Sequence, residues 1–110
     1  MFNVLGFSVM PDYLATYDLM KTNPEPYSEF LEQATKLGWR LWVTDGKDWY
    51  RLPNTTLEGT FATRDAAVAA LKAAGVATAK AIGIKVTIEK WIVTSSEEAT
   101  FNSDVKQPKK

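Results

Sequence analysis

The stretch Tyr13–Lys21, YLATYDLMK, decides the fold, because most of its residues suit a β-strand while an aspartate stands near its end. Tyrosine, leucine and threonine are common in strands, so residues 13–20 are predicted to form the first full strand. Asp18 lies between Tyr17 and Leu19. A lone carboxylate inside a dry sheet costs several kcal/mol unless it is paired or coordinated. The placement of this acid therefore bears on both the fold and the function.

The segment after this strand predicts an amphipathic helix. Asn23 is a favourable N-cap, and the two prolines that follow fit a first turn whose backbone N–H groups have no intrahelical partner. Gly38 is expected to end the helix. Apolar residues recur at helical spacing between these limits: Tyr27, Phe30, Leu31, Ala34 and Leu37.

Residues 39–53, WRLWVTDGKDWYRLP, predict a β-hairpin. Apolar and polar residues alternate on both sides of Asp45-Gly46, a pair that favours a tight turn. Pro53 then restricts the returning strand to a sheet edge or a bulge. Residues 54–61, NTTLEGTF, are consistent with a resumed strand or with a loop.

The second half of the chain predicts a helix and a last strand. Thr63 is expected to cap an alanine-rich helix that begins at Arg64, and Gly75 leaves open whether this is one helix or two. Residues 84–93 alternate between apolar and polar side chains, as a strand does. The polar composition of residues 95–110 predicts a flexible tail.

This element order, β-α-β-β-α-β, predicts an α+β domain over residues 11–94 with the ferredoxin-like arrangement. Its four-stranded antiparallel sheet would carry two helices on one face and leave the other face open. The abundance of aromatic residues favours a homodimer joined through that open face or through a sheet edge. Residues 1–10 are interpreted as an N-terminal extension, an extra edge strand, or the product of a start codon upstream of Met10.

Composition narrows the chemistry further. The 110 residues include no cysteine and no histidine, which excludes thiol and imidazole catalysis and zinc sites built from these residues. Thirteen basic residues balance thirteen acidic ones, so the chain lacks the basic surplus of dedicated nucleic-acid binders. No signal peptide or membrane-spanning segment is predicted, and a cytoplasmic location is expected.

Two interpretations of Asp18 follow from the residues. The acid could cap the turn that begins at KTNP, as aspartates often do. Alternatively, two copies of Asp18 could meet across the two-fold axis of a dimer and hold Mg²⁺, which typically takes one or two carboxylates, water and substrate phosphate. Such an ion would polarise a phosphodiester or activate water.

The motif YLATYDLMK also resembles the first strand of the small CRISPR-associated endonuclease family, the second Cas protein, and of its SinR-type relatives. Tyr27 matches a tyrosine near the start of their first helix. The segments FLEQATKLGW, WYRLP and IKVTIEKW are similar to the GhoS family of antitoxin endoribonucleases. This resemblance implies a ferredoxin-like dimer, a metal-dependent endoribonuclease activity and a metal-binding, catalytic role for Asp18.

A second group of residues is a candidate contact surface for RNA, DNA or a protein partner: Lys21, Arg40, Trp42, Lys47, Trp49 and Arg51. Basic and aromatic side chains in alternation can hold phosphates and stack on bases. They are more often part of a solvated strand face with aromatic cross-strand pairs, because such pairs routinely stabilise sheets. Asp45, Asp48 and Glu58 are further possible metal ligands, or surface acids. The lysines of KQPKK are expected in solvent or on phosphate, and the alternative function is a non-catalytic interaction module, an inhibitor or adaptor.

Overall fold

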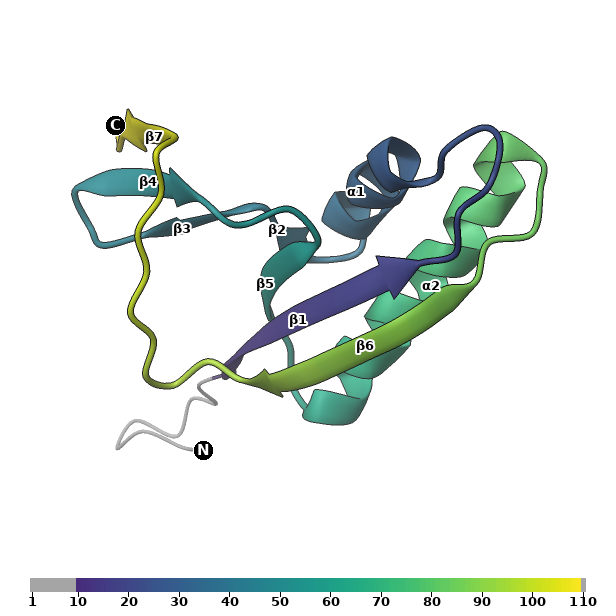
Figure 1. Cartoon of the computed structure of the whole chain (residues 1–110). Coiled ribbons are helices and arrows are strands. Elements are labelled where there is room, and N and C mark those ends of the chain that lie inside the picture. The colour runs from purple at the N-terminus through teal and green to yellow at the C-terminus, as the bar shows by residue number, and fades with distance from the viewer. Residues whose placement is uncertain (1–9, 110) are drawn as a thin grey trace.

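The computed structural model describes residues 10–109 and contains two helices and seven strands in this range (Figure 1). The elements, in chain order, are β1 (Asp12–Leu19), α1 (Tyr27–Lys36), β2 (Trp39–Arg40), β3 (Trp42–Thr44), β4 (Asp48–Arg51), β5 (Thr56–Thr60), α2 (Arg64–Ile82), β6 (Ile88–Ser95) and β7 (Lys106–Pro108). The predicted α+β class is confirmed. Residues 1–9 of the predicted N-terminal extension lie outside the described range.

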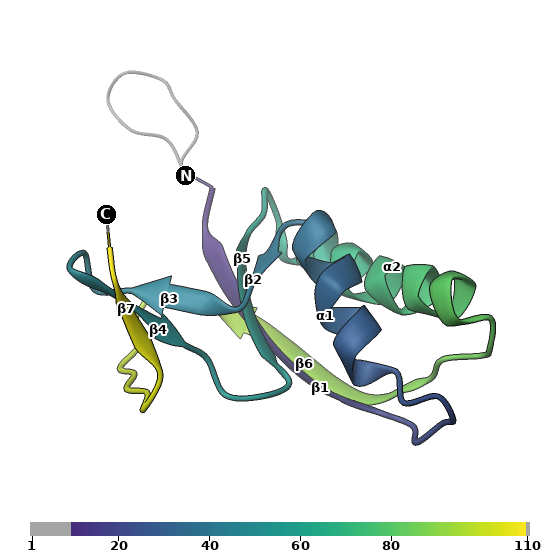
Figure 2. The same ribbon diagram turned by 90° about the horizontal axis from the view of Figure 1, so that it is seen from above.

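The strands form two antiparallel sheets. A four-stranded sheet has the order β2-β5-β1-β6, and a three-stranded sheet has the order β3-β4-β7. Helices α1 and α2 pack against each other and lie together on one face of the larger sheet, while its other face carries no helix (Figure 2). The smaller sheet projects to one side of this body.

Strand β1 shows the alternation that divides the two faces of the larger sheet. Tyr13, Ala15, Tyr17 and Leu19 are all buried toward the helices. The ring of Tyr17 lies 4.6 Å from that of Phe30 in α1, measured between centroids. Because side chains alternate along a strand, the residues between them point to the open face. Asp18 is one of these, so its charge remains in contact with water.

Helix α1 begins later than the sequence predicts. Its N-cap is Pro26, which offers no side-chain acceptor, and the prediction of Asn23 as the cap is wrong. Glu25 fills this role instead, because its carboxylate accepts the backbone N–H groups of Tyr27 at 2.8 Å and Ser28 at 3.2 Å. These bonds lower the pKa of Glu25, the N–H of Ser28 most strongly. The negative charge of a glutamate in this position also interacts favourably with the positive N-terminal end of the helix dipole.

The predicted hairpin is divided between the two sheets. Trp39 pairs with Gly59 in the larger sheet, whereas Val43 pairs with Tyr50 in the smaller one. Leu41 separates the two short strands. In chain order, the third strand of the larger sheet is β5, which lies in the segment for which the sequence allowed a strand or a loop. The hairpin β3–β4 is therefore an excursion between two neighbouring strands of the larger sheet.

Helix α2 confirms its predicted N-terminus and is a single helix. The hydroxyl of Thr63 accepts the N–H of Ala66 at 3.0 Å. Gly75 lies within the helix and is buried, and an added Cβ there would meet Ile88 Cδ1 at 3.2 Å. The small residue thus allows the helix to approach β6 closely.

The C-terminal segment differs from its prediction in two places. Strand β6 begins at Ile88 rather than at residue 84. The sequence predicts a flexible tail from residue 95 onward, whereas Lys106–Pro108 form β7, which pairs with β4. The chain between β6 and β7 crosses to the smaller sheet, so that a cavity of about 460 Å³ remains between this crossover and the open face.

Candidate functional site

Asp18 is exposed on the open face near the end of β1. Lys90 of β6 is its register partner across the ladder, and the register shifts immediately after it. Among residues 10–109, no hydrogen bond or ion pair reaches the Asp18 carboxylate, so the interpretation of Asp18 as a turn cap has no support there. The same range contains no group of three or more acidic residues placed to hold a metal. Within one chain, Asp18 is therefore a single carboxylate.

The predicted contact residues do not form one surface with Asp18. Lys21 is exposed in the loop after β1, near Asp18 in sequence. The hairpin that carries Trp42, Lys47 and Trp49 projects from the opposite side of the larger sheet (Figures 1 and 2). A single ligand site cannot include both groups without spanning the sheet. The structure therefore separates the acid from the aromatic residues.

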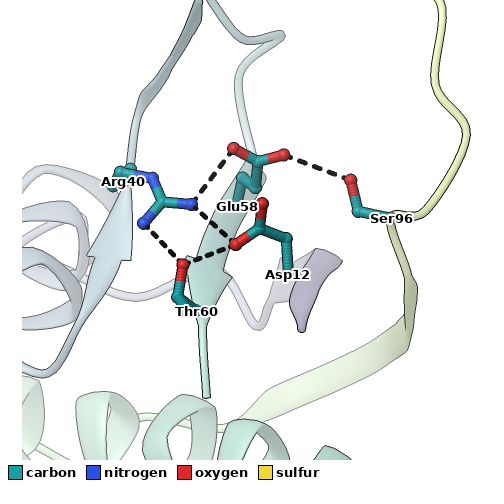
Figure 3. A network of polar contacts seen from close by, with 5 residues as sticks. All are labelled: Asp12, Arg40, Glu58, Thr60 and Ser96. Atoms are coloured by element: carbon teal, nitrogen blue, oxygen red, sulfur yellow. Dashed lines mark hydrogen bonds and ion pairs between the residues drawn. The ribbon is translucent and has the colours of Figure 1, made fainter. Parts of the chain in front are cut away.

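Arg40 is held in a polar network on the open face (Figure 3). Its Nη2 atom lies 3.2 Å from Glu58 Oε1 and 3.4 Å from Asp12 Oδ1, and Nη1 donates to Thr60 Oγ1 at 3.1 Å. Thr60 also donates to Asp12, and Ser96 donates to the second oxygen of Glu58 at 3.1 Å. The network joins β1, β2 and β5 to the crossover after β6. Glu58 is thus a structural partner of Arg40 rather than a ligand beside Asp18.

The guanidinium group of Arg51 also forms hydrogen bonds within the protein. Its Nη1 atom donates to the backbone oxygens of Leu41 at 3.2 Å and Leu52 at 3.1 Å. These bonds tie the base of the hairpin to the point where the chain leaves the larger sheet. Of the three cations predicted on or next to the hairpin, Lys47 is exposed at the tip, whereas Arg40 and Arg51 are bonded to other groups of the protein.

The two hairpin tryptophans lie on one face of the smaller sheet. Trp42 is paired with Arg51 and Trp49 with Thr44, so all four side chains point to the same side. Gln107 of β7 stands opposite Trp49 and extends this face. A cleft of about 490 Å³ lies between the face and the end of α1, and its lining includes Trp39, Arg40, Trp42, Trp49 and Gln107.

The floor of this cleft contains a buried donor. Trp39 is only 2% exposed, and its indole N–H has no acceptor among residues 10–109. Buried indole N–H groups usually have a hydrogen-bond partner. Because the nitrogen atom itself is buried, this N–H is an unpaired donor of the core, and the exposed aromatic surface of the cleft comes from Trp42 and Trp49.

Lysines of the C-terminal segment lie beside the aromatic rings of the hairpin. Lys109 Nζ lies 5.6 Å from the ring centroid of Trp49, and Lys106 Nζ lies 5.8 Å from that of Tyr50. The backbone N–H of Lys109 donates to Lys47 O at 3.0 Å, which brings a third lysine to the same end. The sequence indicated lysines in KQPKK but gave no signal that they return to the tryptophans. A strand pairing over more than 50 residues of separation produces this cluster.

The turn of the hairpin is fixed by Asp45. Its carboxylate accepts the N–H groups of Asp48 and Lys47 at 2.9 Å each and the hydroxyl of Tyr50 at 2.9 Å. These bonds, led by that from Asp48, lower the pKa of Asp45 to about 2, and the same hydrogen bond raises the pKa of Tyr50. Asp45 therefore stabilises the turn, and between residues 10 and 109 it belongs to no group of three or more acidic residues placed to hold a metal.

Tyr17 is not a candidate acid or base. Its hydroxyl is buried without a hydrogen-bond partner among the described residues, and burial raises its pKa above the ordinary value. The side chain is neutral and packs in the core beneath the open face. Its neighbour Asp18 has the opposite orientation.

Comparison with protein-family models, with curated proteins and with solved structures gives no match. Between residues 10 and 109, neither helix is long and apolar enough to cross a lipid bilayer.

Proposed function

We propose that this chain is a nucleic-acid-associated protein that binds single-stranded RNA or DNA in the cleft beside the β3-β4-β7 sheet. The observation that carries the proposal is the convergence of Trp42 and Trp49 on one face with Lys47 from the turn and Lys109 from the segment after β7. Proteins that bind single strands combine aromatic platforms for the bases with cations for the backbone. The neutral net charge predicts weak binding away from this cluster.

The strand order of the larger sheet supports the ferredoxin-like arrangement that the sequence predicts. In the order β2-β5-β1-β6, the first strand lies at the centre and the last strand at one edge, with both helices on one face. On this interpretation the hairpin β3–β4 is an insertion between the second and third strands. The resemblance to the CRISPR-associated, SinR and GhoS group favours RNA as the substrate class.

Binding is tested with a fluorescent hexanucleotide, which is short enough to occupy one chain. Stacking is worth roughly 1–3 kcal/mol per base, so Trp49→Ala is expected to weaken binding about 5- to 150-fold. Trp42→Ala is expected to act in the same range. Trp91→Ala on β6, outside the cleft, is the matched control and leaves affinity unchanged. Equal affinities for wild type and both hairpin variants would refute the proposal.

Salt dependence gives an independent measure of the cations. Each phosphate contact with a single strand contributes a slope of about −0.7 to the plot of log affinity against log salt. Two contacts, by Lys47 and Lys109, predict a slope of about −1.4, since Lys106 pairs with Tyr50 on the opposite face of the smaller sheet. Lys109→Gln is expected to reduce it by about 0.7, whereas Lys80→Gln, on the outer side of α2, leaves it unchanged. A slope near zero would exclude backbone contacts.

Cleavage by a metal held at Asp18 is the second candidate. It is favoured by the exposed position of this carboxylate at the end of β1. Labelled RNA is incubated with the protein in Mg²⁺ or in a chelator. Asp18→Asn should abolish cleavage, while Asp65→Asn, an exposed acid in the first turn of α2, should not. Cleavage that survives in Asp18→Asn rules out this role.

A protein-interaction module, the remaining alternative, would use the same tryptophans. If the chain does not bind the hexanucleotide but captures a specific protein through Trp42 and Trp49, this alternative replaces our proposal. Capture that is insensitive to both tryptophans would exclude it as well.

A further inference from the structure

Strand β6 is an edge of the larger sheet, and one of its sides is unpaired within residues 10–109. The N–H of Ser96 donates to Asp12 O at 3.0 Å, in step with the ladder in which Thr94 and Ile92 pair with Leu14 and Thr16. In an antiparallel ladder, successive residues direct their backbone groups alternately to the two sides. The N–H and C=O groups of residues 91, 93 and 95 therefore point away from β1.

This edge lacks the features that usually keep an edge strand from pairing. Charged side chains, prolines and bulges commonly protect exposed edges. In β6 the two charges, Glu89 and Lys90, and the register shift lie at one end, while Trp91 is 42% exposed and Ile92 is 56% exposed. The segment from Trp91 to Ser95 thus offers backbone donors and acceptors beside apolar side chains.

We propose that this edge pairs with the β6 edge of a second copy of the chain, antiparallel and with the two-fold axis at Ile92. With a two-fold axis perpendicular to the sheet, paired residues of the two strands point to the same face. The axis must then pass beside one residue, which pairs with its own copy, and the choice of that residue fixes the register. A centre at Lys90 would place two lysines opposite each other. A centre at Trp91 would place Lys90 opposite Ile92 of the partner subunit.

The centre at Ile92 is the register in which apolar residues meet on both faces. On the open face, Ile92 meets Ile92 of the partner subunit, and on the helix face, Trp91 meets Val93 of the partner subunit. Lys90 then stands opposite Thr94 of the partner subunit, so no like charges are opposed. Aromatic and β-branched pairs across strands contribute roughly 0.2–1 kcal/mol each.

The helix face supplies additional apolar surface beside this edge. A cavity of about 480 Å³ lies between α2 and β6, and its lining includes Val76, Ile88 and Trp91. Val76 is among the exposed apolar residues of the chain. In the proposed dimer both copies of α2 lie on the same face, so the two cavities flank the joint between the sheets.

This dimer has a consequence for Asp18. Three inter-strand spacings of about 4.8 Å and an offset of four residues at about 3.4 Å place the two Asp18 positions roughly 20 Å apart. One Mg²⁺ ion with bonds of about 2.1 Å cannot bridge that gap. Edge pairing at β6 and an ion shared by two Asp18 residues are therefore mutually exclusive. The single-strand cleft is remote from β6 and does not depend on the dimer.

The oligomeric state tests the proposal directly. Sedimentation velocity of the wild type at rising concentration should show a species of twice the chain mass. Ile92→Lys places two like charges on the axis and is expected to give only monomer. Met20→Lys, which changes an exposed apolar residue away from the edge, should remain dimeric. A monomeric wild type, or a dimer that persists in Ile92→Lys, would overturn the proposal.

The register of the two β6 strands is tested by disulfide formation. Because the chain has no cysteine, any cross-link must come from the introduced residue. Residues at the axis of a pair without direct hydrogen bonds have Cα atoms about 4.5 Å apart, within the range for a disulfide. Ile92→Cys should therefore give a covalent dimer on mild oxidation. Lys90→Cys and Thr16→Cys should not, because their two copies lie far apart. A dimer in which Ile92→Cys does not cross-link must use another surface and would contradict the proposal.

Discussion

Replacing Gly59 with alanine should destabilise the protein, although alanine is generally the better residue in a strand. Gly59 is buried in β5, between Trp39 of β2 and Tyr13 of β1. A Cβ atom at this position would lie 2.5 Å from Phe61 Cε2, 3.0 Å from Gly38 O and 3.0 Å from Trp39 Cε3. Two of these atoms belong to a backbone carbonyl and to a core ring, which cannot move far.

The magnitude follows from two opposing effects. Overpacking a core by one methyl group costs about 1–3 kcal/mol. Removing the glycine lowers the entropy of the unfolded chain and returns about 0.5–1 kcal/mol. Since the backbone oxygen of Gly38 blocks one direction of relaxation, the upper part of the first range applies. We expect a net loss of about 1–2 kcal/mol, which corresponds to a melting temperature roughly 4–10 °C lower.

Gly75→Ala is the matched control. An added Cβ there meets Ile88 Cδ1 at 3.2 Å, the end of a flexible side chain that can rotate away. Alanine is favoured over glycine inside a helix by about 0.8–1.0 kcal/mol. The stability of this variant should be unchanged or higher by up to about 1 kcal/mol. Urea unfolding followed by far-ultraviolet circular dichroism compares the variants. A Gly59→Ala protein as stable as the wild type would refute the packing argument.

Three further changes test other parts of the structure. Thr63→Ala removes the acceptor for the Ala66 N–H and should lower the free energy of unfolding by about 1 kcal/mol, whereas Thr63→Ser should restore most of it. Leu71→Ala, at a fully buried position of α2, should cost about 2–5 kcal/mol, and a cost below about 1 kcal/mol would contradict its place in the core. Asp45 has a pKa lowered to about 2 in the folded protein, so the stability it contributes is present above its ordinary pKa of 3.8 and is lost as the pH falls toward about 2. The difference in urea midpoint between wild type and Asp45→Ala should shrink across that interval, and a constant difference would contradict the assigned bonds.

Local patterns predicted the elements whose residues interact with near neighbours. Thr63 caps α2 as expected, because a cap bond spans only three residues. The composition of residues 13–20 also predicted the strand β1, because strand propensity is a property of the residues themselves. The cap of α1 was missed because Glu25 competes with Asn23 within two residues, and the pattern does not rank them.

The candidate contact residues show the same division. Trp42, Lys47 and Trp49 were found from the hairpin itself, where aromatic and basic residues alternate. Arg40 and Arg51 were assigned to the same surface and do lie beside the tryptophans, but their guanidinium groups are bonded to Glu58 and to the backbone oxygens of Leu41 and Leu52. Those partners are distant in sequence or belong to the main chain. Residue types alone therefore could not separate a ligand-facing cation from a structural one.

The sequence by itself determined the two helices, the first strand, and the tight turn of the hairpin. These features depend on periodicity and on contacts between residues a few positions apart. Only the tertiary structure decided that β2 and β3 belong to different sheets, that the return of β7 brings Lys109 beside Trp49, and that β6 is an edge. The physical reason is that strand pairing depends on backbone hydrogen bonds between distant segments. Every residue but proline carries those backbone groups, so the side-chain pattern does not specify which segments will pair.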